Sequence, residues 1–325
     1  MKVCIFGAGA VGTHVATRLA AARADEVSLV ARGAHLEAIS RRGLTLRTNG
    51  EEITAQPAVA TDDPERLPPQ DLVIATLKAT ALPGAAATIA RLLAPEGCAA
   101  FLLNGITWWW PFGLPGNRGP LPLLDPDGAL WRHLRTRALG CVVNSPNEII
   151  EPGVVLHSGR CRFTFGEPDG SASARAELTA GVFRRGGMEA VVSTDLRREI
   201  WSKLLLNAST NTLSALTRLS PFGLAADPAL HAMMKRLMRE TLDVAAAQGW
   251  DLRAETDIEA LSQRSDRKPG PRVSMLQDVL LGRPLEVEAL LGQTQAFGHE
   301  SSVPIPTIDV ILPLLRGLDR SRTPA

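Results

Sequence analysis

The stretch Met1-Lys2-Val3-Cys4-Ile5-Phe6-Gly7-Ala8-Gly9-Ala10-Val11-Gly12 decides the fold of the first half of the chain. A short apolar run, typical of a buried strand, leads into glycines at positions 7, 9 and 12, and a helical pattern follows. In this strand–turn–helix context, G-x-G-x-x-G indicates a dinucleotide site in which the pyrophosphate lies at the helix N-terminus. The first glycine permits the turn, the second lets the backbone approach the phosphates, and the third lets helix and strand pack closely. The predicted phosphate-binding residues are Gly7, Ala8, Gly9, Ala10, Val11 and Gly12.

The end of the next predicted strand indicates which dinucleotide binds. Val27 to Ala31 is predicted as a strand, and Arg32 follows it with no acidic residue at the same point. NAD-binding units usually place Asp or Glu there for the ribose 2′-hydroxyl, whereas an arginine accommodates a 2′-phosphate. A guanidinium pairs with phosphate through two parallel hydrogen bonds. We therefore predict NADP(H) rather than NAD(H); the alternative is that Arg32 only ends a strand in solvent.

Strand and helix patterns alternate through the first half of the chain, which predicts a doubly wound α/β sheet. Two further apolar runs, typical of buried parallel strands, end shortly before Lys78 and Asn104. Ligands of such sheets lie beyond the carboxyl ends of the strands. Gly7, Arg32, Lys78 and Asn104 are therefore expected to share one edge. Taken singly, Lys78 and Asn104 are more typical of ordinary loop residues.

Two segments of this half carry more specific predictions. Val154 to His157 and Cys161 to Phe165 are predicted as a hairpin around Ser158-Gly159-Arg160. Thr107 to Pro126 has neither helical nor strand period and is predicted as a long loop, a kind of segment that often forms a lid or a binding wall. Because three consecutive tryptophans, Trp108 to Trp110, are not expected to enter one core, some should cap a pocket or contact a partner. The alternative is local packing under their own loop.

Past Thr194 the pattern becomes helical. This change predicts two domains, an α/β dinucleotide-binding domain over residues 1–194 and an all-helical domain over residues 195–325. The predicted helices of the second domain are Asp195–Thr217, Pro228–Gln248, Arg272–Leu281, Glu286–His299 and Pro306–Leu315.

Composition excludes several other classes of protein. A net charge of +1 over 325 residues leaves no basic surface for nucleic acid or for an anionic membrane. No stretch approaches the ~18 apolar residues of a membrane span, and glycines and polar residues interrupt what would be the apolar region of a signal peptide. The four cysteines have no zinc-like spacing. We predict free thiols, no metal and a cytoplasmic location.

One helical stretch of the second half combines residues suited to chemistry. Lys203, Asn207 and Asn211 are four residues apart, so they lie on one stripe of a helix. Asparagine is a poor helix former, and two of them beside a lysine suit a site for a carboxylate or a hydroxyl. The alternative is a solvated helix face.

A later cluster offers a hydroxyl at Ser274 and an acid at Glu286. Taken singly, they are typical of a helical surface serine and of a first-turn acid stabilised by the helix dipole.

These motifs together resemble the ketopantoate reductase (2-dehydropantoate 2-reductase) family, in family order and over nearly the whole chain. The matching features are the glycine turn, Arg32, Leu77-Lys78-Ala79, Asn104-Gly105, Trp201-Ser202-Lys203-Leu204 with Asn207 and Asn211, Ser274-Met275-Leu276-Gln277-Asp278, and Glu286. The resemblance implies a Rossmann-type domain, a helical second domain and the NADPH-dependent reduction of 2-dehydropantoate to pantoate, a reaction of the pantothenate pathway.

The resemblance also implies roles for individual residues. Lys203 corresponds to the catalytic lysine, which we expect to be the proton donor. Asn207, Asn211 and Ser274 would bind the substrate. The residues that would serve the cofactor are Gly7 to Gly12, Arg32, Lys78, Asn104 and Glu286.

The chain departs from the family pattern in two places, and both bear on substrate recognition. The family usually offers a further substrate asparagine beyond Asn211, where this chain has Ser220-Pro221-Phe222. The loop Trp108–Pro126 is longer and more aromatic than usual. A reductase of a bulkier 2-oxo acid or ketone is therefore one alternative, and a non-catalytic NADP(H)-binding sensor is another. Exposed aromatic residues at Trp108–Phe112 would also make a homodimer plausible.

Overall fold

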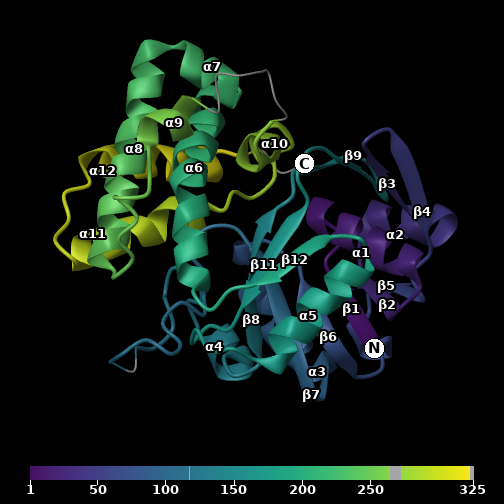
Figure 1. Cartoon of the computed structure of the whole chain (residues 1–325). Helices are drawn as coiled ribbons and strands as arrows, with labels where there is room; N and C mark the ends of the chain where they lie inside the picture. The colour runs from purple at the N-terminus through teal and green to yellow at the C-terminus, as the bar shows by residue number, and fades with distance from the viewer. Residues whose placement is uncertain (117, 264–271, 323–325) are drawn as a thin grey trace. The chain divides into compact units, whose positions relative to one another are not determined.

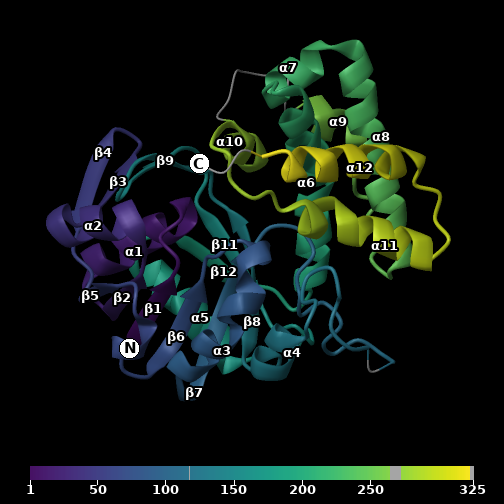
Figure 2. The ribbon, with the colours of Figure 1, turned by 180° about the vertical axis from the view of Figure 1, so that it is seen from behind.

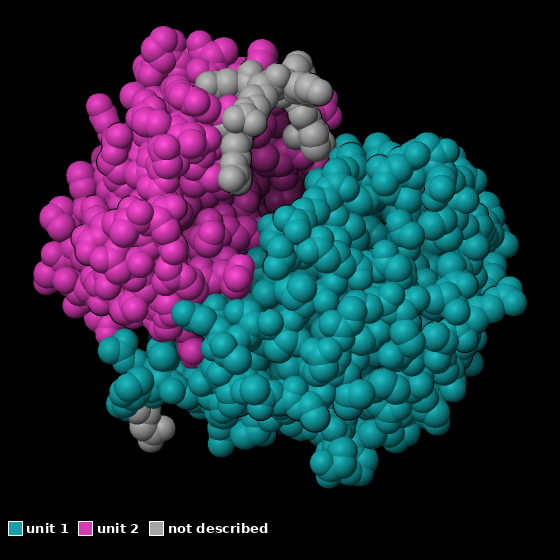
Figure 3. Space-filling view, viewed as in Figure 1, with its two compact units in different colours: residues 1–103, 108–196 teal, residues 104–107, 197–325 magenta. Residues whose placement is uncertain are grey.

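The computed structural model describes residues 1–116, 118–263 and 272–322, and the chain divides into two compact units. Unit 1 comprises Met1–Leu103 and Trp108–Leu196, and unit 2 comprises Asn104–Thr107 and Arg197–Ala325. Figure 3 colours the two units separately. The short segment 104–107 thus packs with the helical unit, although it follows directly on a strand of unit 1.

Unit 1 is built on an eight-stranded sheet of order β12-β11-β8-β7-β6-β1-β2-β5 (Figure 1). Its strands are β1 (Lys2–Phe6), β2 (Glu26–Val30), β5 (Val59–Thr61), β6 (Gln70–Ala75), β7 (Leu93–Leu103), β8 (Ala138–Asn144), β11 (Arg162–Gly166) and β12 (Glu189–Val192). Neighbours are parallel except β8 and β11. The parallel strands β5-β2-β1-β6-β7-β8 follow the 3-2-1-4-5-6 order of dinucleotide-binding sheets, which confirms the predicted Rossmann-type α/β fold.

Helices cover both faces of this sheet, which explains why its central strands are apolar throughout. The helix α1 (Ala10–Ala22) packs beside α5 (Ala174–Arg185), and α3 (Leu82–Leu92) packs beside α4 (Ala129–Leu134). The helix α5 lies in front of the sheet in Figure 1, and α3 lies in front in the reverse view of Figure 2. Near the carboxyl ends of β2 and β6 lie α2 (Gly33–Arg42) and the short 3₁₀ helix η2 (Ala79–Ala81).

A second, four-stranded sheet of order β4-β3-β10-β9 packs against α1. Its strands are β3 (Leu44–Thr48), β4 (Glu51–Ala55), β9 (Asn147–Glu151) and β10 (Val154–His157).

The predicted hairpin of β10 with β11 is wrong. The strand β10 pairs with β9 and β3, whereas β11 pairs with β8 and β12 in the large sheet. The true hairpin turns at Gly153, whose φ of +80° suits glycine. Residues 158–161 carry the chain from one sheet to the other, a change that alternation of apolar residues does not reveal.

The prediction that some tryptophans cap a pocket or contact a partner is also wrong, because Trp108, Trp109 and Trp110 are at most 2% exposed. Trp108 packs edge-on against Phe101, with ring centroids 5.1 Å apart. The ring of Trp109 fills the space over Gly140 of β8. The backbone of residues 108–110 forms turns rather than a strand or helix, and all three side chains are buried. The expectation of a homodimer loses this support.

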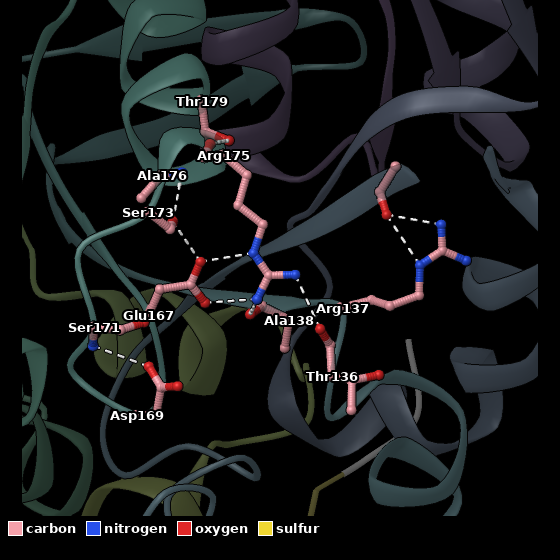
Figure 4. Close-up of polar contacts among 11 residues, drawn as sticks. Thr136, Arg137, Ala138, Glu167, Asp169, Ser171, Ser173, Arg175, Ala176 and Thr179 are labelled. Carbon is pink, nitrogen blue, oxygen red and sulfur yellow. Dashed lines mark hydrogen bonds and ion pairs between the residues drawn. The ribbon is translucent and has the colours of Figure 1, made fainter. Parts of the chain in front are cut away.

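A buried ion pair joins three elements of unit 1 (Figure 4). Arg175 at the start of α5 makes a two-pronged contact with Glu167, with both N–O distances 2.6 Å, and Ser173 also donates to that carboxylate. The same guanidinium donates to the carbonyl oxygens of Thr136 and Ala138, at the start of β8. The carboxylate of Glu167, whose side chain is 5% exposed, thus accepts three hydrogen bonds, as a buried carboxylate requires.

In unit 2 the described residues form helices and connecting segments. The helices are α6 (Leu196–Thr217), α7 (Pro221–Ala226), α8 (Pro228–Ala247), α9 (Ile258–Ser262), α10 (Ser274–Leu280), the π-helical segment η4 (Glu288–Gly292), α11 (Gln293–Glu300) and α12 (Pro306–Arg320). The last helix extends beyond the predicted Leu315 to Arg320, and Arg316 in this extension makes a two-pronged ion pair with Glu288. Within the described ranges, no helix combines the length and apolar character needed to cross a bilayer.

We predict that Gly140→Ala destabilises the protein. A Cβ at this position would lie 2.3 Å from the Trp109 ring and 2.4 Å from Leu196, and such overpacking costs about 1–3 kcal/mol. Urea unfolding followed by circular dichroism measures the change. The control is Gly84→Ala in α3, where an added Cβ meets no atom of the described residues within 4 Å. Equal stability of the two variants would contradict the packing described for Trp109.

Candidate active site

The structure needs glycine at Gly7 and Gly12 of the opening turn for reasons that do not apply to Gly9. Gly7 has a φ of +120°, and a Cβ there would press on Thr76 and Leu77 at 3.1 Å. A Cβ on Gly12 would lie 2.0 Å from the Gly7 carbonyl oxygen, because the first turn of α1 packs directly on the glycine turn. Gly9 has an ordinary φ of −70°, and its Cβ would meet no atom of the described residues within 4 Å. The fold itself therefore requires Gly7 and Gly12, while the space over Gly9 is open to a ligand.

The N-terminus of α1 fits an anionic group. Gly9 is the N-cap and offers no side chain to the first backbone N–H groups, and Ala10, Val11 and Gly12 bring no acid to the first turn. Uncapped N–H groups and the helix dipole together favour a phosphate. Ala8 lies in the turn itself and is half-buried, while Gly9 is exposed.

The structure places Gly7, Arg32 and Lys78 at the same edge of the large sheet. Phe6 at the end of β1 pairs with Val30 of β2 and with Ala75 of β6, so the segments that follow these strands leave the sheet together. Arg32 is exposed at the N-cap of α2 and makes no ion pair or side-chain hydrogen bond with any described residue. Lys78 is half-buried at the N-cap of η2.

Unit 2 contains a series of three polar side chains that are far apart in the sequence. Lys203 Nζ donates a hydrogen bond of 2.7 Å to Asn104 Oδ1, and Asn104 Nδ2 donates one of 3.3 Å to Glu286 Oε2. Glu286 is 8% exposed, whereas Lys203 and Asn104 are half-buried. The amide of Asn104 thus presents its acceptor to the cation and its donor to the carboxylate.

The backbone of the segment 104–107 holds Asn104 in this position. Ile106 N donates 2.8 Å to the carbonyl oxygen of Ala289, in the π-helical segment that follows Glu286. Gly105 has a φ of +73°, and a Cβ there would lie 2.1 Å from the same oxygen. Only glycine permits this approach. The Asn104-Gly105 pair in the sequence indicates a turn, but residue spacing does not predict that this turn contacts Ala289 in η4.

The predicted stripe lies on α6 as expected from helical spacing, but its members differ in environment. Asn207 is half-buried, and its amide makes no hydrogen bond to a described residue. Asn211 is 3% exposed, and its Oδ1 accepts from Met275 N at 3.1 Å and from Ser274 Oγ at 3.3 Å. The carbonyl of Asn211 therefore joins α6 to the start of α10, which leaves its Nδ2 for a ligand. Ser274 itself is exposed.

A Rossmann-type unit with an open phosphate turn, and a helical unit that carries a lysine–asparagine–glutamate series, define the class of this protein. Residues 3–109 match the family model described as Ketopantoate reductase PanE/ApbA, and residues 195–319 match the model of its C-terminal part. The chain belongs to the ketopantoate reductase family of oxidoreductases, as the resemblance of its motifs predicted.

Individual relatives agree with this family. The 2-dehydropantoate 2-reductase of Mesorhizobium japonicum is 39% identical to this chain, over 98% of both chains. A solved structure from Ralstonia solanacearum MolK2 is 36% identical, with a TM-score of 0.90 over 99% of this chain and 98% of the other. A PanE/ApbA family ketopantoate reductase from Ralstonia eutropha JMP134 is 29% identical, with a TM-score of 0.83 over 99% of each chain.

We predict that alanine at two glycines of the turn affects different properties: dinucleotide binding at Gly9 and stability of the fold at Gly12. Gly9→Ala should change the free energy of unfolding by less than about 1 kcal/mol but weaken dinucleotide binding at least about tenfold, because the methyl group occupies the space left for phosphate. Gly12→Ala should destabilise the fold by about 1–3 kcal/mol through its contact with Gly7. Thermal unfolding and NADPH titration by fluorescence distinguish the two. Wild-type NADPH affinity in Gly9→Ala would show that the phosphates lie elsewhere.

Proposed function

We propose that this chain catalyses the NADPH-dependent reduction of 2-dehydropantoate to pantoate, with Lys203 as the proton donor. The observation that carries the proposal is the hydrogen-bonded series from Lys203 through Asn104 to Glu286, in a chain whose relative from Mesorhizobium japonicum is a 2-dehydropantoate 2-reductase. We place the reaction in the cytoplasm, where the four free cysteines would stay reduced.

The residues of unit 1 fit a phosphorylated dinucleotide. The uncapped start of α1 suits the pyrophosphate, and the open space over Gly9 allows it to approach the backbone. Arg32, with no ion pair to a described residue, would hold the 2′-phosphate. Lys78 and the amide of Asn104 would also serve the cofactor. When bound, the cofactor supplies the hydride for the carbonyl carbon of the substrate.

Lys203 would provide the proton that this reduction requires. Reduction of a ketone builds negative charge on its oxygen, and a positioned acid at that oxygen lowers the barrier. The ammonium group has three donors, and the one directed at Asn104 Oδ1 fixes the position of Nζ. The carboxylate of Glu286 orients the Asn104 amide from its other end. Lys203 would therefore present its ammonium group to the substrate oxygen from a position that Asn104 and Glu286 set.

The amides along α6 would bind the rest of the substrate. Asn207 and the Nδ2 group of Asn211 are donors without charge, so they can hold a carboxylate or a hydroxyl beside a cation without competing with it. Ser274, at the start of α10, adds a hydroxyl on the same helix pair. These assignments make Lys203 the sole cation of the substrate set.

One observation favours a different substrate within the same family. Where the family usually has a further asparagine, Ser220 caps the short helix α7 by accepting from Gly223 N, and Phe222 is exposed. The Ser220 hydroxyl is thus engaged, and a phenyl group adds apolar surface. A bulkier 2-oxo acid or ketone is therefore the second candidate, and a non-catalytic NADP(H)-binding sensor is the candidate from another class.

Lys203→Ala should lower kcat by about 10²–10⁴-fold with 2-dehydropantoate, the range typical of general acid catalysis. NADPH affinity should stay near the wild-type value. The assay follows NADPH consumption, first with 2-dehydropantoate and then with a panel of bulkier 2-oxo acids. The control is Lys235→Ala, which removes a half-buried lysine paired with Glu259 on the same unit.

The outcomes of this assay separate the candidates. Faster turnover of a bulkier 2-oxo acid would show that this acid, rather than 2-dehydropantoate, is the substrate. Tight NADPH binding without turnover of any ketone would favour the sensor. Loss of NADPH binding in the Lys203 variant would mean that this lysine serves the cofactor.

Arg32→Ala should weaken NADPH binding by about 10–100-fold, because a hydrogen bond between charged groups contributes about 1.5–3 kcal/mol to the binding free energy. NADH binding should change little, because NADH lacks the 2′-phosphate. Titration of both cofactors, with Arg41→Ala on the same helix as the control, measures the difference. An equal loss for NADPH and NADH would contradict the placement of Arg32 at the 2′-phosphate.

A further inference from the structure

A cluster of three metal-binding side chains lies in unit 1 between α1 and the four-stranded sheet. His14 comes from α1, His157 ends β10, and Cys161 lies in the segment that leads to β11. One ring nitrogen of each histidine and the sulfur of Cys161 lie within 4.8 Å of one another. The two imidazole rings are 4.7 Å apart between centroids, and His14 and His157 are 0% and 3% exposed.

The hydrogen bonds of His14 determine which nitrogen faces the sulfur with its lone pair. Asn147 Nδ2 donates to Ser145 O and Oγ, at 2.9 and 3.0 Å, so its Oδ1 points at His14 Nδ1, 2.7 Å away. An amide oxygen only accepts, so Nδ1 of His14 carries the proton. The lone pair of His14 therefore lies on Nε2, where it accepts a hydrogen bond from the Cys161 thiol, with an N–S distance of 3.8 Å.

His157 contains a buried nitrogen that the described residues leave unpaired. Its Nδ1 lies 2.9 Å from Thr48 Oγ1, whereas its Nε2 is buried and has no hydrogen-bond partner among the described residues. Buried polar atoms without partners are rare and need an explanation. Burial lowers the pKa of His14 to about 3 and also lowers the pKa of His157, an effect that a hydrogen bond with the backbone of Arg160 opposes.

We propose that His14, His157 and Cys161 form a zinc-binding site, with water as the fourth ligand. Two imidazole nitrogens and one thiolate are donors that Zn²⁺ prefers, and three protein ligands with an open position are a common arrangement. Bonds of about 2.0–2.1 Å to nitrogen and about 2.3 Å to sulfur agree with the 3.8 Å between His14 Nε2 and Cys161 Sγ. Asn147 and Thr48 hold the outer nitrogens, as partners of metal-bound histidines usually do.

Binding would change the protonation of one group. Burial raises the pKa of the Cys161 thiol, and a hydrogen bond with Ser145, followed by the cation of Arg18, opposes that rise. The thiol would lose its proton to solvent as the Zn–S bond forms. The bound ion would join α1, which begins at the phosphate turn, to β10 of the second sheet. This site is separate from the proposed reaction, and neither result depends on the other.

The spacing of the cysteines gave no sign of this site, and we predicted no metal from it. The three ligands are spread between positions 14 and 161. Only the packing of α1 on β10 brings them together.

The test uses the metal-free full-length protein. It is titrated with Co²⁺ while the absorption spectrum is recorded, and its affinity for Zn²⁺ is then measured by competition with a chelating indicator dye. We expect one equivalent of Co²⁺ to give a thiolate-to-cobalt absorption band that Zn²⁺ removes. Cys161→Ser should abolish this band. Cys161→Ser and His157→Ala should each weaken Zn²⁺ binding at least about 100-fold, because the loss of a residue that only hydrogen-bonds to a metal ligand already weakens binding by up to about 100-fold. The control is Cys98→Ala, which removes a buried cysteine of the large sheet and should leave both signals unchanged.

A second measurement uses only the wild-type protein, in case the variants do not fold. Stoichiometric Zn²⁺ should slow the alkylation of Cys161 by iodoacetamide at least about tenfold, as mass spectrometry of that peptide would show, because the metal holds the reactive thiolate. An unchanged alkylation rate, or Co²⁺ binding without a thiolate band, would overturn the proposal.

Discussion

The carbonyl oxygen of Ala289 is the contact on which the candidate active site depends. It accepts a hydrogen bond from Ile106 N and leaves no room for a side chain at Gly105. This backbone contact sets the position of Asn104, which in turn orients both Lys203 and Glu286. Ala289 lies in a π-helical segment, and such segments occur frequently at functional sites because they redirect side chains locally.

Glycines of this protein fall into two physical groups. At Gly7, Gly12, Gly105 and Gly140, a Cβ would meet atoms of the protein itself at 3.1 Å or less, so these positions are requirements of packing. Gly9 is different, because the space beside it is open and its backbone conformation is ordinary. Open space alone is not specific, since Gly84 in α3 also has it, but at Gly9 that space lies at the N-terminus of α1, where an anion is favoured.

The sequence was sufficient for features that depend on local order. Glycines between a strand and a helix predicted the Rossmann-type unit, and residues four apart predicted that Lys203, Asn207 and Asn211 share a face of α6. It was insufficient where distant segments meet. The partner sheet of β10, the contact of Gly105 with η4 and the convergence of His14 on Cys161 all depend on tertiary packing, which has no local pattern.

The tryptophan segment shows a different failure. We assumed that consecutive bulky residues compete for one core face, yet Trp108 to Trp110 lie in turns and all three are buried. Gly140 was the overlooked signal, since a glycine inside a strand often marks the close approach of a neighbour. The ring of Trp109 is that neighbour.

The grouping of residues 104–107 with the helical unit means that the two units are not two consecutive pieces of chain. A fragment from Arg197 onward would contain Lys203 and Glu286 but would lack the asparagine that joins them, and a fragment ending at Leu196 would carry that asparagine without either partner. Neither fragment alone could therefore form the hydrogen-bonded series, which needs residues from both sides of the boundary at Leu196.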